Sequence, residues 1–239
     1  MTPRESEIIG LIRKEVKPAL GCTEPIAVAL AVAKAMEVMD ENIDICGWRM
    51  SGEYLLCIEV SGNILKNGMG VGIPGTGMVG LHIAAALGAV CGKSRYGLEV
   101  LNDLTDKAVS LSKAMVEEEK VSVRLAETDL KLYVKASVEY NGHATYAVIE
   151  NDHDNIVETG FDGTSNRSSS FEGVSEVCGE QKSTLDYNLT VKEILEFATS
   201  VAYSDIEFIL ESRTLNLALA NEGMTGAYGL RVGYAISLD

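Results

Sequence analysis

Cys22 is the residue of this sequence best placed for chemistry, in the segment KPALGCTEPIAVALAVAKAM. It lies immediately before a run of apolar residues typical of a buried helix. A cysteine that served only packing would normally lie within the run. Unpaired N–H groups and the helix dipole favour negative charge at a helix start, so we expect a lowered pKa for the thiol. Its position leaves three roles open: nucleophile, metal ligand or structural cysteine.

The side chains around this cysteine do not decide between those roles. Glu24 could support Cys22, although an acidic residue in the first turn of a helix is also ordinary compensation of the dipole. No general base can be assigned from the neighbouring sequence. The remaining cysteines form no C-x-x-C pair, which argues against a disulfide framework and against a self-contained zinc or ferredoxin motif; they are Cys46, Cys57, Cys91 and Cys178.

A glycine-rich segment, GTGMVG at positions 75–80, matches the G-x-G-x-x-G pattern of dinucleotide-binding loops. That fingerprint also requires a second parallel strand ending in an acidic residue, and Glu99 instead falls in a predicted helix, so nucleotide binding is disfavoured. Two alternatives stay open. The glycines serve turns and close packing, or they let the backbone approach a small ligand, with Asn67, Thr76 and the amides near Gly77 as contacts.

Start and stop signals predict the elements that position these residues. The sequence Thr2-Pro3-Arg4-Glu5 predicts a capped helix that runs to Lys17-Pro18, and Thr23 is predicted to cap a second helix reaching about Val38. Hydrophobic patterns predict the next elements: strands at 44–50 and 54–60, a turn or short helix at 61–68, a brief strand, a buried helix after the glycine-rich segment, and one amphipathic helix over 96–120.

The second half of the chain is predicted to be mostly strands and then helices. Strands are expected at 121–127, 132–140, 144–151 and 153–161, with Asn141-Gly142 as a hairpin turn. The Ser/Gly-rich stretch 162–183 predicts a mobile loop or linker within a single domain. Thr190 and Asp205 are predicted to cap helices at 191–202 and 206–223. This order of elements predicts an α+β fold, an antiparallel or mixed sheet packed with several buried helices.

Composition narrows the class of protein further. The 239 residues are 46% hydrophobic, which is ample for a packed core, and neither a membrane span nor a secretory signal is indicated, so we expect a cytoplasmic protein. The net charge of -15, without a basic cluster, disfavours a nucleic-acid partner. The three histidines, His82, His143 and His153, show no metal-binding spacing.

Several blocks stand out between Glu15 and the C-terminus: EVKPALGCTEPIAVALA, KNGMGVGIPGTGMVGLHIAAALGA, GLEVLNDLT, KVSV, HDNIV and FILESRTLNLALANEGMTGAYGL. They closely resemble the L-cysteine desulfidase family, the UPF0597 or YhaM-like proteins, which is related to the α chain of iron–sulfur L-serine dehydratases. The resemblance implies a lyase that removes sulfide from L-cysteine, or water from L-serine, leaving aminoacrylate that hydrolyses to pyruvate and ammonia. In that family three cysteines hold a [4Fe-4S] cluster whose open iron acts as a Lewis acid.

The resemblance also implies roles for particular residues. Cys22 matches the cysteine of the family's GCTEP motif and is implied to be one of the three cluster ligands, with Glu24 as its support. His153 is implied to be a proton carrier, although a structural histidine is an equal alternative. The implied contacts to the L-cysteine or L-serine substrate are Asn67, Thr76, Gly77 and Asn216.

The chain departs from the family in length. Family members are about twice as long, and their other two cluster cysteines belong to a C-terminal half that is not in this sequence. The resemblance therefore implies an N-terminal half, inactive and without a cluster by itself, which is either a piece of a longer protein or one subunit of a split enzyme. We expect an apolar face where the missing half docks, and the chain could also form a homodimer through that face. A different class of function stays open: a non-catalytic amino-acid-binding or assembly module.

Overall fold

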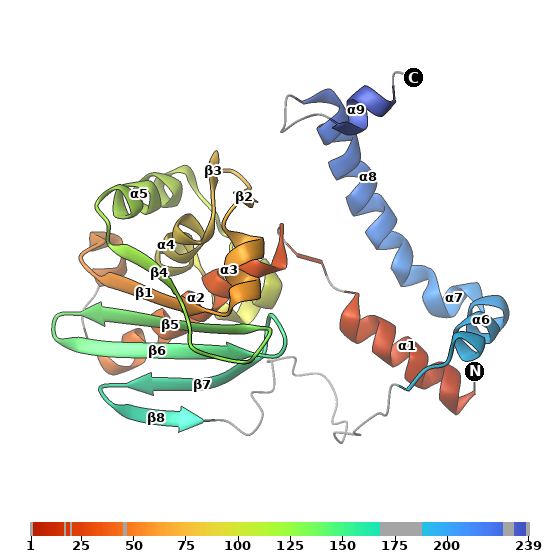
Figure 1. Ribbon diagram of the computed structural model, residues 1–239, viewed down its shortest axis with the longest axis horizontal. Helices are drawn as coiled ribbons and strands as arrows, with labels where there is room; N and C mark the ends of the chain where they lie inside the picture. The colour runs from red at the N-terminus through yellow and green to blue at the C-terminus, as the bar shows by residue number, and fades with distance from the viewer. Residues whose placement is uncertain are drawn as a thin grey trace. The chain divides into compact units, whose positions relative to one another are not determined.

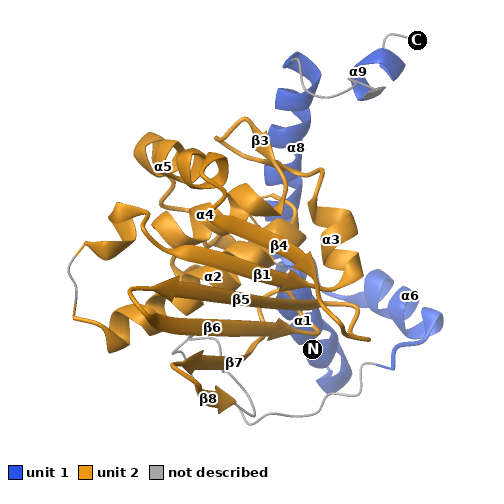
Figure 2. Ribbon diagram, turned by 60° about the vertical axis from the view of Figure 1, so that its left-hand side comes forward, with its two compact units in different colours: residues 1–18, 179–239 blue, residues 19–178 orange. Residues whose placement is uncertain are grey.

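The structure, a computed structural model, describes residues 2–16, 18–19, 21–44, 47–167, 188–226 and 232–237. The chain divides into two compact units (Figure 2), residues 19–178 and residues 1–18 with 179–239. The α+β fold predicted from the sequence is confirmed. Within the described ranges, no helix combines the length and apolar character needed to cross a membrane.

The larger unit, residues 19–178, is built on a six-stranded mixed sheet with the strand order β4-β1-β5-β6-β7-β8. β1 (Leu55–Val60) runs parallel to β4 (Val121–Leu125), and the other neighbours are antiparallel. The remaining strands are β5 (Tyr133–Tyr140), β6 (His143–Glu150), β7 (Ile156–Phe161) and β8 (Thr164–Arg167). A parallel pair needs a long crossover, which here contains α3 (Gly62–Gly68), α4 (Leu81–Cys91) and α5 (Asp106–Glu117).

One face of the sheet is covered by helices, with α2 (Thr23–Asn42) and α4 packed together against it (Figure 1). A Cβ at Gly88 of α4 would lie 2.8 Å from Ala29 Cα of α2, so the two backbones touch where the helices cross. The Thr145 hydroxyl of β6 donates a 2.9 Å hydrogen bond to the Ala35 carbonyl of α2. Because α2 is enclosed by the sheet and by α4, its apolar residues form the centre of the core.

Two tight turns determine the register of the antiparallel strands. Asn141 and Gly142, at φ 49° and 82°, join β5 to β6, which confirms the predicted hairpin. Asp162 and Gly163, at φ 44° and 81°, join β7 to β8 in the same way. The prediction of a loop from residue 162 onward is therefore wrong for Thr164–Arg167, while residues 168–187 lie outside the described residues.

The strand predicted at 44–50 is wrong for the part that the structure describes beyond residue 46. Trp48–Ser51 forms the 3-10 helix η1, because Gly47 and Gly52 on either side adopt left-handed conformations that a strand cannot contain. The Trp48 ring packs 5.4 Å from the ring of Tyr54 and 4.8 Å from that of Tyr140. Trp48 is therefore a β-type residue whose place here reflects burial and not an extended backbone.

The single helix predicted over 96–120 is also wrong. The segment contains the 3-10 helix η2 (Ser94–Glu99), a turn, and then α5, whose N-cap is Thr105. Gly97 breaks the helix because it takes φ 53° and ψ −123°, a conformation outside the helical region. Apolar residues recur at helical spacing through the whole segment because both parts pack against the same core.

The smaller unit, residues 1–18 with 179–239, is helical in its described part. Its elements are α1 (Pro3–Glu15), α6 (Val191–Ser200), α7 (Tyr203–Ile206), the 3-10 helix η3 (Glu207–Ile209), α8 (Leu210–Thr225) and α9 (Val232–Ile236). The predicted caps Thr2 and Thr190 are confirmed, each within a capping box. The helix predicted to start at an Asp205 cap is wrong, because α7, η3 and α8 divide that region.

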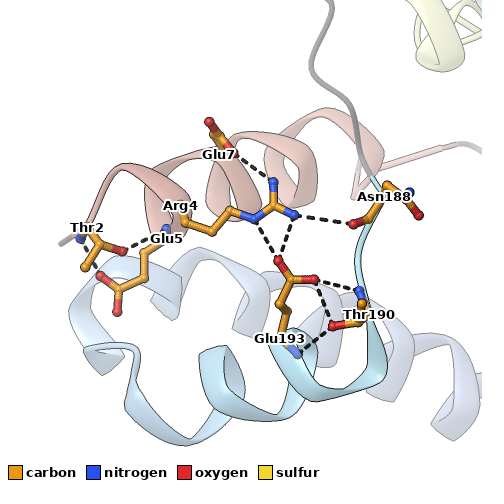
Figure 3. A network of polar contacts seen from close by, with 7 residues as sticks. All are labelled: Thr2, Arg4, Glu5, Glu7, Asn188, Thr190 and Glu193. Carbon is orange, nitrogen blue, oxygen red and sulfur yellow. Dashed lines mark hydrogen bonds and ion pairs between the residues drawn. The ribbon is translucent and has the colours of Figure 1, made fainter.

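Polar contacts join α1 to α6 within the smaller unit (Figure 3). The Arg4 guanidinium donates to Glu193 Oε1 at 3.0 and 3.2 Å and to Glu7 Oε2 at 2.9 Å. These side chains are partly exposed, so we attribute only a modest stabilisation to them. The buried residues of α1 are Ile8 and Ile9, whereas α6, α7, η3 and α8 bury none.

Candidate functional site

Cys22 lies at the N-terminus of α2, where it is the N-cap residue with φ −68° and ψ 137°. The predicted cap, Thr23, is wrong by one position, since Thr23 is already the first helical residue. The Cys22 side chain does not cap the helix, and it is exposed. Its thiol donates a 2.7 Å hydrogen bond to Glu24 Oε2. The sulfur at the helix start is therefore accessible and held by a carboxylate.

The predicted lowering of the Cys22 pKa is wrong. Partial loss of hydration around the sulfur raises the pKa of the thiol, and the hydrogen bond to Glu24 raises it further. The backbone N–H groups of Thr23 and Glu24 act in the expected direction and lower it, but they are outweighed. The hydrogen bond from Cys22 lowers the pKa of Glu24 most, so the negative charge at this helix start lies on the carboxylate.

Glu24 connects three of the residues singled out from the sequence. Its Oε2 accepts from Cys22, and its Oε1 accepts a 3.1 Å hydrogen bond from Asn67 Nδ2 at the end of α3. His153, in the turn between β6 and β7, lies close enough for its charge to lower the pKa of Glu24 as well. The fold thus joins Cys22, Glu24 and Asn67 by hydrogen bonds, and His153 acts on Glu24 through its charge alone.

The glycine-rich segment reaches the same helix start through Pro74. A Cβ at Gly21, which has φ +106°, would lie 3.6 Å from Pro74 Cδ. Pro74 belongs to the turn between β2 (Gly72–Ile73) and β3 (Met78–Val79), which pair antiparallel in a sheet of their own. The dinucleotide fingerprint needs a parallel strand, so the surroundings of GTGMVG do not match it.

The glycines of this region fall into two groups. Added Cβ atoms at Gly68, Gly75 and Gly80 would clash with Leu81, Leu104 and the Met69 carbonyl, so close packing accounts for these three. Nothing lies within 4 Å of such an atom at Gly70, Gly72 or Gly77. Gly77 has φ +67°, which explains its identity, whereas Gly70 and Gly72 have ordinary φ values. Both readings from the sequence therefore retain support, at different glycines.

Two predicted substrate contacts, Thr76 and Asn216, form hydrogen bonds within their own elements. Thr76 is buried, and its hydroxyl donates to the Ile73 carbonyl at 2.7 Å and accepts from the Met78 N–H at 3.0 Å, so it holds the β2–β3 turn. Asn216 belongs to the smaller unit, on α8, where its amide donates to the Ser212 carbonyl at 2.6 Å. Their contact with substrate, like that of Gly77, stays a prediction.

The thiols of the described residues fit one ligand position of an iron–sulfur cluster and not a complete set. Cys57 lies on β1, and Cys91 ends α4, with its thiol directed to the Leu87 carbonyl at 3.3 Å. Cys46 and Cys178 lie outside the described ranges. Within those ranges no three His, Cys, Asp or Glu side chains gather as a metal site. A four-iron cluster would need ligands from elsewhere in addition to Cys22.

Sequence reasoning missed Pro74 and the central place of Glu24. The only local signal for Pro74 was its position within the glycine-rich stretch, and its contact with Gly21 depends on how the β2–β3 turn folds back. Glu24 was noted as a support for Cys22, but its hydrogen bond to Asn67 joins residues 43 positions apart. Such a contact cannot be read from spacing along the chain.

This chain is thus an α+β protein with a cysteine–carboxylate pair at a helix start, and comparison with known proteins gives its family. It is 43% identical to a UPF0597 protein of Oleidesulfovibrio alaskensis over 236 residues, and 42% identical to UPF0597 protein YhaM of Escherichia coli O1:K1 over 238 residues. The chain belongs to the UPF0597 family.

The match covers nearly all of this chain but only about half of each relative. It covers 99% and 98% of this chain but 52% and 51% of the two relatives, so the chain spans about half the length of the curated relatives it matches. No family model matches the chain. No solved structure resembles it significantly.

Proposed function

We propose that this chain is one part of an iron–sulfur-dependent lyase that eliminates sulfide from L-cysteine, or water from L-serine. The observation that carries the proposal is the exposed Cys22 thiol at the start of α2, 2.7 Å from Glu24. It is the cysteine of the GCTEP motif on which the resemblance to cysteine desulfidases rests. An exposed thiol suits a metal ligand better than it suits a core residue.

The overall reaction removes a proton from the substrate Cα and breaks the Cβ–S or Cβ–O bond. Sulfide or water leaves, and the aminoacrylate hydrolyses to pyruvate and ammonia. When bound, a [4Fe-4S] cluster with one open iron would supply a Lewis acid for the departing group. Cys22 would contribute one of its ligands, and the others would come from outside the described residues.

The chain's own residues have roles in binding and positioning the substrate. The Asn67 amide N–H₂ is engaged by Glu24, which leaves the Asn67 carbonyl oxygen to accept from a substrate ammonium group. The open backbone around Gly70, Gly72 and Gly77 allows close approach of a carboxylate. His153 is the candidate for carrying the Cα proton, since imidazole is suited to proton transfer near neutral pH.

Anaerobic reconstitution tests the proposal. The chain would be combined with the complementary part, defined as the portion of the Oleidesulfovibrio alaskensis relative that this chain does not match, and supplied with iron and sulfide. We expect cluster absorbance, and release of sulfide and pyruvate from L-cysteine or of pyruvate from L-serine. Absence of both cluster and products would contradict the lyase and favour an amino-acid-binding or assembly module.

Cysteine variants test the ligand separately. Cys22→Ala should abolish cluster uptake, whereas Cys57→Ala, at a half-buried thiol on β1, should leave uptake unchanged. Uptake that survives in Cys22→Ala would remove the ligand assignment. Asn67→Ala is expected to raise KM more than it lowers kcat, because it removes a substrate contact and not a reacting group. His153→Gln should chiefly lower kcat.

A further inference from the structure

Helix α8 contains an uncharged stretch, rich in leucine and alanine, that the described residues of its own unit leave in contact with solvent. We call residues 214–221, TLNLALAN, the α8 segment. Every residue of it is exposed, and Leu215, Leu217 and Leu219 keep 50%, 49% and 72% of their surface accessible. Successive helical residues are rotated by 100°, so leucines two positions apart point to different sides. A helix that is apolar on more than one side is normally enclosed by other elements.

We propose that the α8 segment is a docking surface for the complementary part of a UPF0597 protein. This chain accounts for 52% of the Oleidesulfovibrio alaskensis relative, so the complementary part is comparable in size to the chain itself. A polypeptide of that size can form its own core and still present an apolar groove to a helix. The inference concerns assembly and holds whether or not the protein is a lyase.

Charge favours the complementary part over a second copy of this chain. Residues 188–226 carry six acidic side chains, from Asp205 and five glutamates, against the two basic side chains of Lys192 and Arg213. The whole chain has a net charge of -15. Two copies that met through this region would bring like charges together around the uncharged leucines, which opposes association. A partner of different sequence does not have to repeat these acidic side chains.

Docking would also change the surroundings of Asn216, the predicted substrate contact in the middle of the α8 segment. Its amide N–H₂ already donates to the Ser212 carbonyl within the same helix. Its side-chain carbonyl oxygen can accept from a group on whatever covers the helix. The segment would therefore supply apolar area from its leucines and one polar contact from Asn216, a combination typical of the centre of a protein interface.

Binding of the separately expressed complementary part, measured aerobically without iron or substrate, tests the proposal. The informative variant is Leu219→Glu, with Leu217→Gln as a milder second variant. Leu125→Glu is the matched control, since Leu125 is 60% exposed on β4 in the other unit. We expect Leu219→Glu to raise Kd by about tenfold or more, because burial of a leucine side chain is worth that much. Leu125→Glu should change Kd by less than about twofold.

Hydrogen exchange and mass measurement complete the experiment. Amides of residues 214–221 should exchange at least tenfold more slowly when the complementary part is added. Slow exchange in the chain alone would instead mean that the chain covers its own helix, which overturns the proposal. A homodimer that Leu219→Glu dissociates would replace the proposed occupant by a second copy. Unchanged Kd in both leucine variants, with circular dichroism confirming that they fold, would also overturn it.

Discussion

Helices α2 and α8 are both long and contain many apolar residues, mainly alanine and valine in α2 and leucine in α8, yet the described structure surrounds them very differently. Helix α2 lies between the six-stranded sheet and α4, and most of its residues are buried. Helix α8 has no buried residue. An apolar helix sequence therefore predicts that other elements cover the helix. Which elements cover it depends on the tertiary structure and cannot be read from the helix sequence.

The contacts that stabilise each unit internally also differ in kind. The larger unit relies on a continuous apolar core that includes residues from α2, α4, α5 and the sheet. In the smaller unit, α1 and α6 are joined by the partly exposed pair Arg4 and Glu193, and the Arg13 guanidinium stacks 3.9 Å from the Phe208 ring centre. We expect the larger unit to respond to changes in packing and the smaller one to changes in charge.

Leucine truncation should give the largest difference between the two helices. Leu30→Ala in α2 removes a side chain that is 1% exposed, and we expect it to lower the free energy of unfolding by about 3 kcal/mol. Leu219→Ala in α8 should change it by less than about 0.5 kcal/mol. Urea unfolding followed by circular dichroism and by Trp48 fluorescence measures both. Equal losses would show that α8 is packed in solution.

Glycine substitution sharpens the same comparison. Gly88→Ala places a methyl group against the Ala29 backbone, where α4 crosses α2, and should destabilise the protein by about 2 kcal/mol. Gly223→Ala in α8 meets nothing within 4 Å and should stabilise that helix by roughly 0.5 kcal/mol through its higher helix propensity. Urea midpoints of the two variants should move in opposite directions. A neutral Gly88→Ala would mean that the helices can separate at little cost.

A smaller difference in stability is expected between two threonine variants, one with a buried hydroxyl and one with an exposed hydroxyl. Thr145→Val removes the hydrogen bond to the Ala35 carbonyl of α2 while keeping the side-chain volume, and should lower the free energy of unfolding by about 1 kcal/mol. Thr214→Val on α8 removes an exposed 3.4 Å hydrogen bond to the Leu210 carbonyl, and we expect no measurable loss. Thermal unfolding of the two variants beside the parent chain would distinguish them.

The smallest expected difference between the two units is in how their amide protection depends on pH. The Thr190 N–H, then the Thr190 hydroxyl and Arg4, lower the pKa of Glu193 in the folded chain. The stabilisation from this carboxylate is therefore complete above the unfolded pKa near 4.5 and is lost as pH falls through the lower folded pKa. Protection of α6 amides, corrected for intrinsic exchange, should fall in that window more than protection of α4 amides, because α4 contains no carboxylate. In Glu193→Gln this pH dependence should disappear.

Local signals were sufficient wherever a residue's conformation is decided by its neighbours in the chain. The Thr2 and Thr190 caps and the Asn141-Gly142 hairpin depend on side chains within a few residues, and all three were predicted. The predictions at 44–50 and 96–120 were wrong because apolar spacing reports burial and not backbone conformation. At both places a glycine backbone angle interrupts the pattern.

The candidate site shows the same limit. The position of Cys22 at the start of a helix could be inferred from its place before an apolar run, and the structure confirms that position at the N-terminus of α2. The direction of the Cys22 pKa shift could not be inferred from the sequence. The sequence indicates the helix dipole, but it shows neither the hydration of the sulfur nor the orientation of Glu24. The Asn67 hydrogen bond to Glu24, and the effect of His153 on the Glu24 pKa, depend on how α3 and the β6–β7 turn fold back toward α2.

The sequence by itself determined the α+β class, the helix caps at Thr2 and Thr190, the hairpin and the presence of helices with many apolar residues, because these follow from propensity and spacing. The tertiary structure alone decided that β1 pairs parallel with β4, that Glu24 carries the charge beside Cys22, and that the described residues of each unit cover α2 but not α8. The physical reason is that such features depend on groups distant in sequence, whose separation, hydration and partners are fixed only when the chain has folded.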